Sequence, residues 1–114
     1  HVHIPYVEAR LLSQLYAAAT IVLSTSHFET MGATLMEGIA GGATAVTFGT
    51  AGQTDIVADG ENGYIAAYPD PASVADCMAR GLAAPFPRDA QHRSIGRRFA
   101  ADTVARRFLR LLHG

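Results

Sequence analysis

The sequence contains no lysine and no tryptophan, and Cys77 is its single cysteine. With one thiol, an intrachain disulfide is excluded, and a cytoplasmic or membrane-peripheral location is favoured. No apolar run approaches the roughly 20 residues that a membrane-spanning helix needs, and no segment has the pattern of a signal peptide. Without lysine, all nine basic residues are arginines, so a step that needs a lysine amine must draw on another segment or chain.

Charge is also scarce, which excludes several classes of protein. Only 17 % of the 114 residues are charged, the formal net charge is −1, and 49 % of the residues are hydrophobic. Such a chain is too apolar for a disordered tail, offers no basic surface to nucleic acid, and has the length of one small domain. The five histidines show no metal-ligand spacing and no cysteine cluster accompanies them, so we expect neither a metal nor a cofactor.

Apolar residues alternate between the spacing of helices and that of buried strands. This alternation predicts helices over residues 8–19, 32–40, 53–58 and 73–82 and from 88 onward, and strands over 20–24, 44–48 and 64–66. The first five residues resemble the inside of a further strand, and Ser73 is the predicted cap of a helix. We therefore expect an α/β fold: a Rossmann-like, partial doubly wound parallel sheet with helices on both faces, whose missing strands precede His1.

The junction that follows the strand over residues 20–24 is the candidate for chemistry. In open α/β sheets, ligands bind at the carboxyl ends of strands, where a loop leads into a helix. The next helix is predicted to begin near Gly32, so its free backbone N–H groups and its dipole favour an anion or another polar ligand. Junctions of this kind are common, however, and many bind nothing.

Two carboxylates flank this helix start. Glu29 stands just before it, where a carboxylate serves either as a ligand contact or merely as a dipole partner or cap. Glu37 shares a helical face with Thr34 and Gly41, and this periodicity favours a solvated outer face. A carboxylate can also accept two hydrogen bonds from a vicinal diol such as that of a ribose. Periodicity does not choose between these interpretations.

The run SHFETMGATLMEGIAGG over residues 26–42 resembles the signature of the family 4 (group 1) retaining glycosyltransferases, which have the GT-B fold. That signature places two glutamates at the spacing of Glu29 and Glu37. Three further runs resemble the same family in the same order along the chain: LYAAA at residues 15–19, FGTAGQTDIV at 48–57 and DGENGYI at 59–65. Together the four runs cover most of the chain.

Several positions depart from the family pattern. Met31 stands where phenylalanine is usual, Gly38 where alanine is usual, and Ala51 where the family has a loop glycine. None of these changes removes the two glutamates. The arginine and lysine pair of the family, which neutralises the donor diphosphate, normally precedes this region, and a chain without lysine cannot complete that pair.

The resemblance implies a role for the whole chain. Residues 1–114 would form a partial C-terminal nucleotide-sugar-binding domain, truncated at its N-terminal side, with residues 88–114 as its C-terminal helical segment. Such a domain serves the retaining transfer of a hexosyl group from a nucleotide-diphosphate sugar to a glycan or lipid acceptor, for example in polysaccharide biosynthesis. Its partner would be the missing N-terminal Rossmann domain, so this chain alone would carry only part of the active site.

The resemblance also implies site residues. Glu29 would contact the donor sugar as the catalytic carboxylate, and Glu37 would hold the ribose. The other expected donor contacts, followed by the two glycines of a candidate pocket loop, are His27, Thr30, Met31, Gly32, Ala33, Gly49 and Gly52. Among these, the N–H groups of residues 31–33 would meet donor hydroxyls or the diphosphate.

Other interpretations stay open. The chain could be a non-catalytic Rossmann-like binding or assembly module, or part of another GT-B enzyme such as a nucleotide-sugar epimerase. His27 could be a local hydrogen-bonding residue, while Tyr16 is expected to pack and Cys77 to be buried. The arginines from 88 to 110 suit either a peripheral membrane contact or a solvated helical face.

Overall fold

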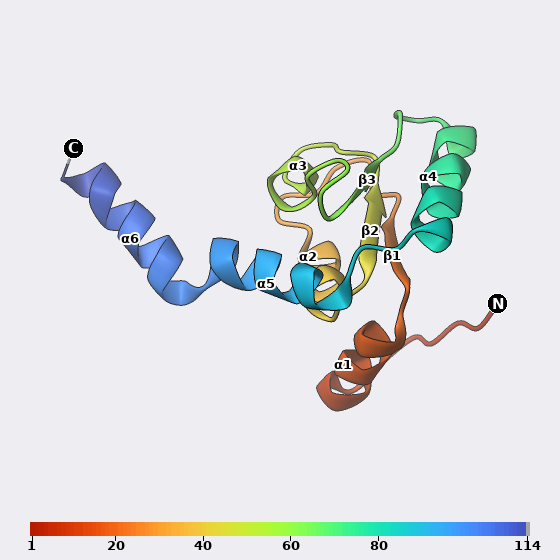
Figure 1. Cartoon of the computed structure of the whole chain (residues 1–114), viewed down its shortest axis with the longest axis horizontal. Helices are drawn as coiled ribbons and strands as arrows, with labels where there is room; N and C mark the ends of the chain where they lie inside the picture. The colour runs from red at the N-terminus through yellow and green to blue at the C-terminus, as the bar shows by residue number, and fades with distance from the viewer. Residues whose placement is uncertain (114) are drawn as a thin grey trace.

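The computed structural model describes residues 1–113, in which three strands and six helices follow one another (Figure 1). In chain order they are α1 (Ala9–Ala18), β1 (Ile21–Ser24), α2 (Ala33–Ala40), β2 (Thr44–Thr47), α3 (Gln53–Ile56), β3 (Gly63–Ile65), α4 (Pro71–Ala83), α5 (Arg88–Phe99) and α6 (Ala101–Leu112). Helices and strands alternate up to α4, which confirms the predicted α/β alternation.

The three strands form one parallel sheet in the order β1-β2-β3. Ala45 on β2 pairs with Val22 on β1 and with Gly63 on β3. Because successive strand residues point to opposite faces, Ala45 joins the apolar cluster under α2 and α5, whereas Val46 joins the cluster under α4. Helices therefore cover both faces of the sheet, as predicted, and β2 is buried along its whole length.

Helix α2 lies very close to β1, and Gly38 is the reason. A Cβ atom built on Gly38 would lie 2.5 Å from the Cβ atom of Val22. This distance is far inside van der Waals contact, so a larger residue fits only if the helix moves away from the sheet. The glycine that departs from the family pattern thus sets the spacing between α2 and β1.

A single side chain at the start of α5 ties together the C-terminal ends of α1 and α2. The guanidinium of Arg88 donates hydrogen bonds to the carbonyl oxygens of Ala17, Ala19 and Gly41. Carbonyl groups at helix C-termini lack intrahelical partners, and a cation there interacts favourably with the helix dipole. Arg88 therefore helps to hold α1 against α2.

Residues 1–8 form no strand, so the prediction of a strand over residues 1–5 is wrong. The side chains of Val2 and Ile4 are exposed. A strand persists only where a neighbour supplies hydrogen-bond partners, and among the described residues no adjacent strand lies beside this segment. Its apolar pattern alone is not sufficient.

Helix α4 begins earlier than predicted, and Ser73 does not cap it. The side chain of Asp70 is the cap, because it accepts a hydrogen bond from the N–H of Ala72 at 3.0 Å, while Pro71 occupies the first helical position. The Oγ atom of Ser73 instead accepts a hydrogen bond from the N–H of Ala67 at 2.8 Å. Proline has no N–H to satisfy and a φ suited to a first turn, so the helix starts before Ser73.

The C-terminal segment, predicted as continuous helix, divides into α5 and α6 at Ala100, whose ψ of 139° is extended. Helix α6 projects away from the sheet, and its main contacts are with α5 (Figure 1). The large apolar side chains of α6 are all exposed, and they are Val104, Phe108, Leu109, Leu111 and Leu112. Among the described residues, no helix combines the length and the apolarity needed to cross a membrane.

Candidate functional site

A polar hollow lies where β1 ends. It has a volume of about 390 Å³ and is lined by Leu23, Ser24, Thr25, Ser26, Glu29, Gly32, Thr34 and Leu35. We call it the Glu29 hollow. Four of its side chains carry hydroxyl groups and one carries a carboxylate, so it can hydrogen-bond a polyhydroxylated ligand. In the described part of the chain, no group of three His, Cys, Asp or Glu side chains is placed to hold a metal ion.

The start of α2 supplies backbone donors to the Glu29 hollow. Gly32 precedes the helix with a φ of 64°, a left-handed conformation that favours glycine. Within residues 1–113 no side chain caps this helix start, and the N–H of Met36 bonds to the Gly32 carbonyl oxygen at 3.1 Å. The N–H groups of residues 33–35 consequently lack helical partners. These free amides begin two residues later than the predicted set over residues 31–33.

The loop that carries Glu29 is held by the loop between β2 and α3. The N–H of Gly52 donates to the Glu29 carbonyl oxygen at 2.8 Å, and Thr50 Oγ1 donates to the Ser26 carbonyl oxygen at 3.3 Å. A Cβ atom at position 52 would lie 2.1 Å from the Thr30 carbonyl oxygen, so only glycine allows this contact. Gly52 thus supports the backbone of Glu29 from outside the hollow.

The same supporting loop is anchored to the sheet at Gly49 and Gln53. Gly49 has a φ of 67°, and a Cβ atom there would lie 2.5 Å from Cγ2 of Ile65. The side-chain oxygen of the buried Gln53 accepts a hydrogen bond from Thr47 Oγ1 at 2.5 Å. Gly49 therefore shapes the path of the loop as it leaves β2, while its place in a pocket loop stays a prediction.

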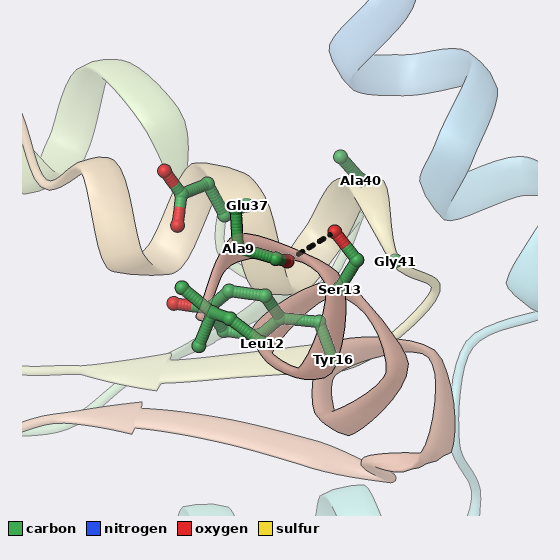
Figure 2. Close-up of a pocket in the computed structure, with 7 residues that line it drawn as sticks. All are labelled: Ala9, Leu12, Ser13, Tyr16, Glu37, Ala40 and Gly41. Atoms are coloured by element: carbon green, nitrogen blue, oxygen red, sulfur yellow. Dashed lines mark hydrogen bonds between the residues drawn. The ribbon is translucent and has the colours of Figure 1, made fainter. Parts of the chain in front are cut away.

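Glu37 lies elsewhere, in a groove between α1 and α2 (Figure 2). The groove has a volume of about 430 Å³ and is lined by Ala9, Leu12, Ser13, Tyr16, Glu37, Ala40 and Gly41. Figure 2 shows Glu37 on α2 and Tyr16 on α1, on opposite helices of the groove. Glu37 is exposed, as its helical periodicity predicts. Its charge is therefore available to a ligand from solvent.

Tyr16 connects this groove with the Glu29 hollow. Burial, and after it the charge of Glu37, raises the pKa of the Tyr16 hydroxyl above its ordinary value, and a hydrogen bond with Thr34 opposes the rise. Tyr16 also packs against the apolar core, as predicted. Thr34 lines the Glu29 hollow and Tyr16 lines the groove, so the contact between these two side chains links the two sites.

The remaining predicted residues lie outside the Glu29 hollow. An apolar hollow of about 470 Å³ is lined by Thr30, Met31, Met36, Gly52, Asp55, Ile56, Phe99 and Val104. His27 lines yet another hollow, and its Nδ1 atom lies 2.6 Å from the Tyr68 hydroxyl. Ala33 is exposed in the first turn of α2. Among the predicted residues of the described chain, Glu29 and Gly32 are the two that the Glu29 hollow brings together.

Sequence reasoning did not select Ser24, Thr25 and Thr34, although all three line the Glu29 hollow. Ser24 and Thr25 follow directly on a buried strand, where side chains reach the edge of the sheet at which ligands bind. Thr34 stands in the first turn of α2, next to the free amides. Several hydroxyl side chains in a row after a buried strand are therefore the sequence feature that could have indicated these residues as part of the site.

The fold and the site together define a class of protein. A parallel α/β sheet, with a polar hollow at a strand end beside an uncapped helix that follows a glycine, is the arrangement by which Rossmann-like domains bind nucleotides and related anions. Comparison with known families narrows this class, because the family described as "Glycosyl transferases group 1" matches residues 1–98. The chain belongs to this family.

Two individual proteins illustrate the relationship. The chain is 37 % identical over 95 residues to a D-inositol 3-phosphate glycosyltransferase of Frankia alni, a match that covers 83 % of this chain and 21 % of that protein. It also resembles a chain of the solved structure described as "Crystal structure of GtfA/B complex", with a TM-score of 0.66, 23 % identity, and coverage of 90 % of this chain and 22 % of that one. The chain thus spans about a fifth of the length of either protein, and the structural likeness confirms the Rossmann-like fold.

Proposed function

We propose that this chain forms the donor side of a retaining glycosyltransferase that transfers a hexosyl group from a nucleotide-diphosphate sugar to a glycan or lipid acceptor. The observation that carries the proposal is that Glu29 and the uncapped start of α2 line one hollow. When charge separates in a reacting ligand, a carboxylate stabilises the positive part and free N–H groups stabilise the negative part. Membership of the glycosyl transferase family supports the same function.

The reaction needs both kinds of group. In retaining transfer, positive charge develops at the anomeric carbon while negative charge grows on the departing diphosphate. The Glu29 carboxylate suits the first charge, and the N–H groups at the start of α2 suit the second. The sugar hydroxyls then meet the side chains of Ser24, Thr25 and Thr34. These groups accelerate transfer to the extent that they hold the transition state more strongly than the bound donor.

Glu37 is proposed to hold the donor ribose, with its two carboxylate oxygens accepting hydrogen bonds from the vicinal hydroxyls. Its groove has apolar walls, to which Leu12 and Ala40 contribute, so part of a nucleoside can be shielded from water there. Thr34 of the Glu29 hollow contacts Tyr16 of the groove, so the two sites are linked. The donor would therefore place its ribose by Glu37, its diphosphate near the start of α2 and its sugar by Glu29.

The proposed site is incomplete within this chain. Within residues 1–113, none of the nine arginines lines the Glu29 hollow, and the sequence has no lysine to balance a diphosphate. We propose that the missing cations and most acceptor contacts come from an N-terminal Rossmann domain of a longer protein. The proposal agrees with the length of its relatives, since this chain spans only about a fifth of each of them. The proposed setting is polysaccharide biosynthesis in the cytoplasm or at its membrane surface.

Nucleotide binding tests the role of Glu37 in the whole protein that carries this chain. Titration calorimetry with uridine and guanosine diphosphates should show binding that Glu37→Ala weakens by roughly 10- to 100-fold, because hydrogen bonds to a charged group are lost. Glu61→Ala removes an exposed carboxylate from the turn before β3 and should leave the affinity unchanged. Equal affinities for Glu37→Ala and the unmodified protein would remove the ribose assignment.

Turnover tests the role of Glu29. Glu29→Gln keeps the size of the side chain but removes its charge, so the transfer rate should fall by roughly 100-fold or more while nucleoside diphosphate affinity is retained. Two acceptors are tried: a methyl hexopyranoside as a minimal glycan, and D-inositol 3-phosphate, which appears in the name of the relative from Frankia alni. Transfer at the unmodified rate in Glu29→Gln would contradict the catalytic assignment. Donor binding without any transfer in the unmodified protein would favour a binding or assembly module.

A further inference from the structure

A further hollow of about 340 Å³ opens beside the Glu29 hollow, and the proposed donor does not use it. Its lining consists of Thr25, His27, Phe48, Pro69, Pro71 and Val74. We call it the His27 hollow. Because Thr25 lines both hollows, the two adjoin at the carboxyl edge of the sheet. Its volume lies within the roughly 300–1,000 Å³ of small-molecule sites.

Three aromatic side chains, from the segments that follow the three strands, brace the His27 hollow. His27 follows β1, Phe48 follows β2 and Tyr68 follows β3. The Tyr68 ring meets the rings of both His27 and Phe48 edge to face, with centroids 5.4 Å apart in each pair. Edge-to-face pairs are a favoured aromatic geometry, so the three rings hold one another in place. The wall is therefore built jointly by segments far apart in sequence.

A hydrogen bond also fixes the imidazole of His27. Its Nδ1 atom lies 2.6 Å from the hydroxyl oxygen of Tyr68. This bond occupies Nδ1 in either tautomer, which leaves Nε2 as the ring nitrogen for a ligand. A ligand hydroxyl both donates and accepts, so it can bond to Nε2 whichever nitrogen carries the proton.

The lining of the His27 hollow suits a neutral sugar ring. Its walls are apolar except for Thr25 and His27, and none of the described side chains that line it carries a fixed charge. A pyranose has the complementary surface, with C–H groups on its faces for aromatic and proline walls and hydroxyls at its rim for polar side chains. A diphosphate instead requires cations or free backbone amides, which favours the start of α2 for that group.

We propose that the His27 hollow binds a sugar ring of the acceptor, next to the donor sugar in the Glu29 hollow. The assignment rests on the proposed transferase function, since a transferase to a glycan brings a second, neutral sugar up to the donor. His27 and Phe48 touch this ring, and Tyr68 is a positioning residue that acts through His27. His27, which its place two residues before Glu29 makes a candidate donor contact, is thereby assigned to the acceptor.

Saturation-transfer NMR on the whole protein tests the proposal, with the methyl α-pyranosides of glucose, mannose and galactose as probes. At least one probe should receive saturation at its ring C–H protons, and should keep it when uridine or guanosine diphosphate is bound. His27→Ala and Phe48→Leu should each weaken probe binding by about fivefold, as expected for loss of one polar or aromatic contact. Phe48→Leu keeps an apolar side chain, so it separates loss of the ring from loss of folding.

Two further variants sharpen the test. Tyr68→Phe keeps the aromatic ring but removes the hydroxyl, so it should weaken probe binding and change the ¹⁵N shifts of the His27 imidazole, which report its tautomer. Leu82→Ala truncates an exposed apolar side chain near the other end of α4 and should leave probe binding unchanged. Unaltered His27 shifts in Tyr68→Phe would contradict the positioning role.

Three outcomes would overturn the proposal: no saturation of any probe, displacement of the probes by nucleoside diphosphate, or unchanged binding in both His27→Ala and Phe48→Leu. Calorimetry on the same samples separates this inference from the donor function. A protein that binds nucleoside diphosphates but no pyranoside contradicts the acceptor assignment alone. A protein that binds no nucleoside diphosphate contradicts the proposed function itself.

Discussion

The backbone N–H of Gly52 donates a hydrogen bond of 2.8 Å to the carbonyl oxygen of Glu29. Gly52 precedes α3, whereas Glu29 lies in the loop between β1 and α2, so the bond joins two neighbouring strand-end loops. It is made at the residue proposed as catalytic. Since a Cβ atom at position 52 would lie 2.1 Å from the Thr30 carbonyl oxygen, the contact depends on glycine.

Gly52→Ala should therefore displace the loop that carries Glu29. Overpacking of this kind lowers the free energy of unfolding by about 1–3 kcal/mol, and a shift of about 1 Å in a reacting group lowers a rate by roughly 100-fold. Urea denaturation and transfer rates of the whole protein measure the two effects. Gly60→Ala is the control, because Gly60 has a φ of 79° but open space around it, so backbone strain should cost about 1 kcal/mol without loss of rate. An unchanged rate in Gly52→Ala would contradict the supporting role.

Gly38→Ala should destabilise the domain although it restores the residue usual in the family. The new methyl group would overlap Val22, which we expect to lower the free energy of unfolding by about 1–3 kcal/mol. Val22→Ala removes the two Cγ atoms at 2.6 and 2.7 Å but keeps the Cβ atom, so it relieves part of the overlap, and the double variant should lose less stability than the sum of the two single changes. Gly96→Ala, within α5 and free of neighbours, should instead stabilise the chain by about 0.5–1 kcal/mol. Denaturant titrations give all four values, and strict additivity of Gly38→Ala and Val22→Ala would contradict the contact.

Stability should fall as the pH rises above about 10, in part because of Tyr16. Burial and the charge of Glu37 raise the pKa of Tyr16 in the folded chain, so the unfolded chain releases the phenolic proton first. The folded state then binds more protons, and the free energy of unfolding decreases with rising pH. This contribution is complete below the unfolded pKa and is lost as the pH rises through the folded pKa.

Denaturation followed between about pH 8 and 11 measures this dependence. Tyr16→Phe should remove this part of the decline. Glu37→Gln should make it smaller and end it at a lower pH, because the carboxylate no longer raises the pKa of Tyr16 in the folded chain. Burial also raises the pKa of the Cys77 thiol and contributes a decline of the same sign, so the comparison is made between variants that all retain Cys77. A decline as steep in Tyr16→Phe as in the unmodified chain would contradict the assignment.

The local pattern of apolar residues is sufficient to predict most helices and strands of this fold. The buried strands and the helices between them follow from runs whose period and length are distinctive, and Cys77 is buried and Tyr16 packed as predicted. Residues 1–5 have the same apolar character yet form no strand, because strand formation needs a partner that sequence pattern does not supply. Pattern alone does not distinguish Asp70 from Ser73 as the cap of α4, because both side chains cap well; Pro71, which suits the first helical position, makes Asp70 the cap.

Hydrophobic period and a family spacing are local properties, so the strand–loop–helix junction over residues 20–40, with Glu29 and Glu37 around it, can be predicted from the sequence. The directions in which these two carboxylates face depend on how the helices pack. Glu29 precedes α2, so no helical period relates it to Glu37, and packing of α1 beside α2 puts Glu37 in a separate groove. The bond from Gly52 and the ring contacts of Tyr68 join segments distant in sequence, and such contacts exist only once the sheet has brought its strand ends together.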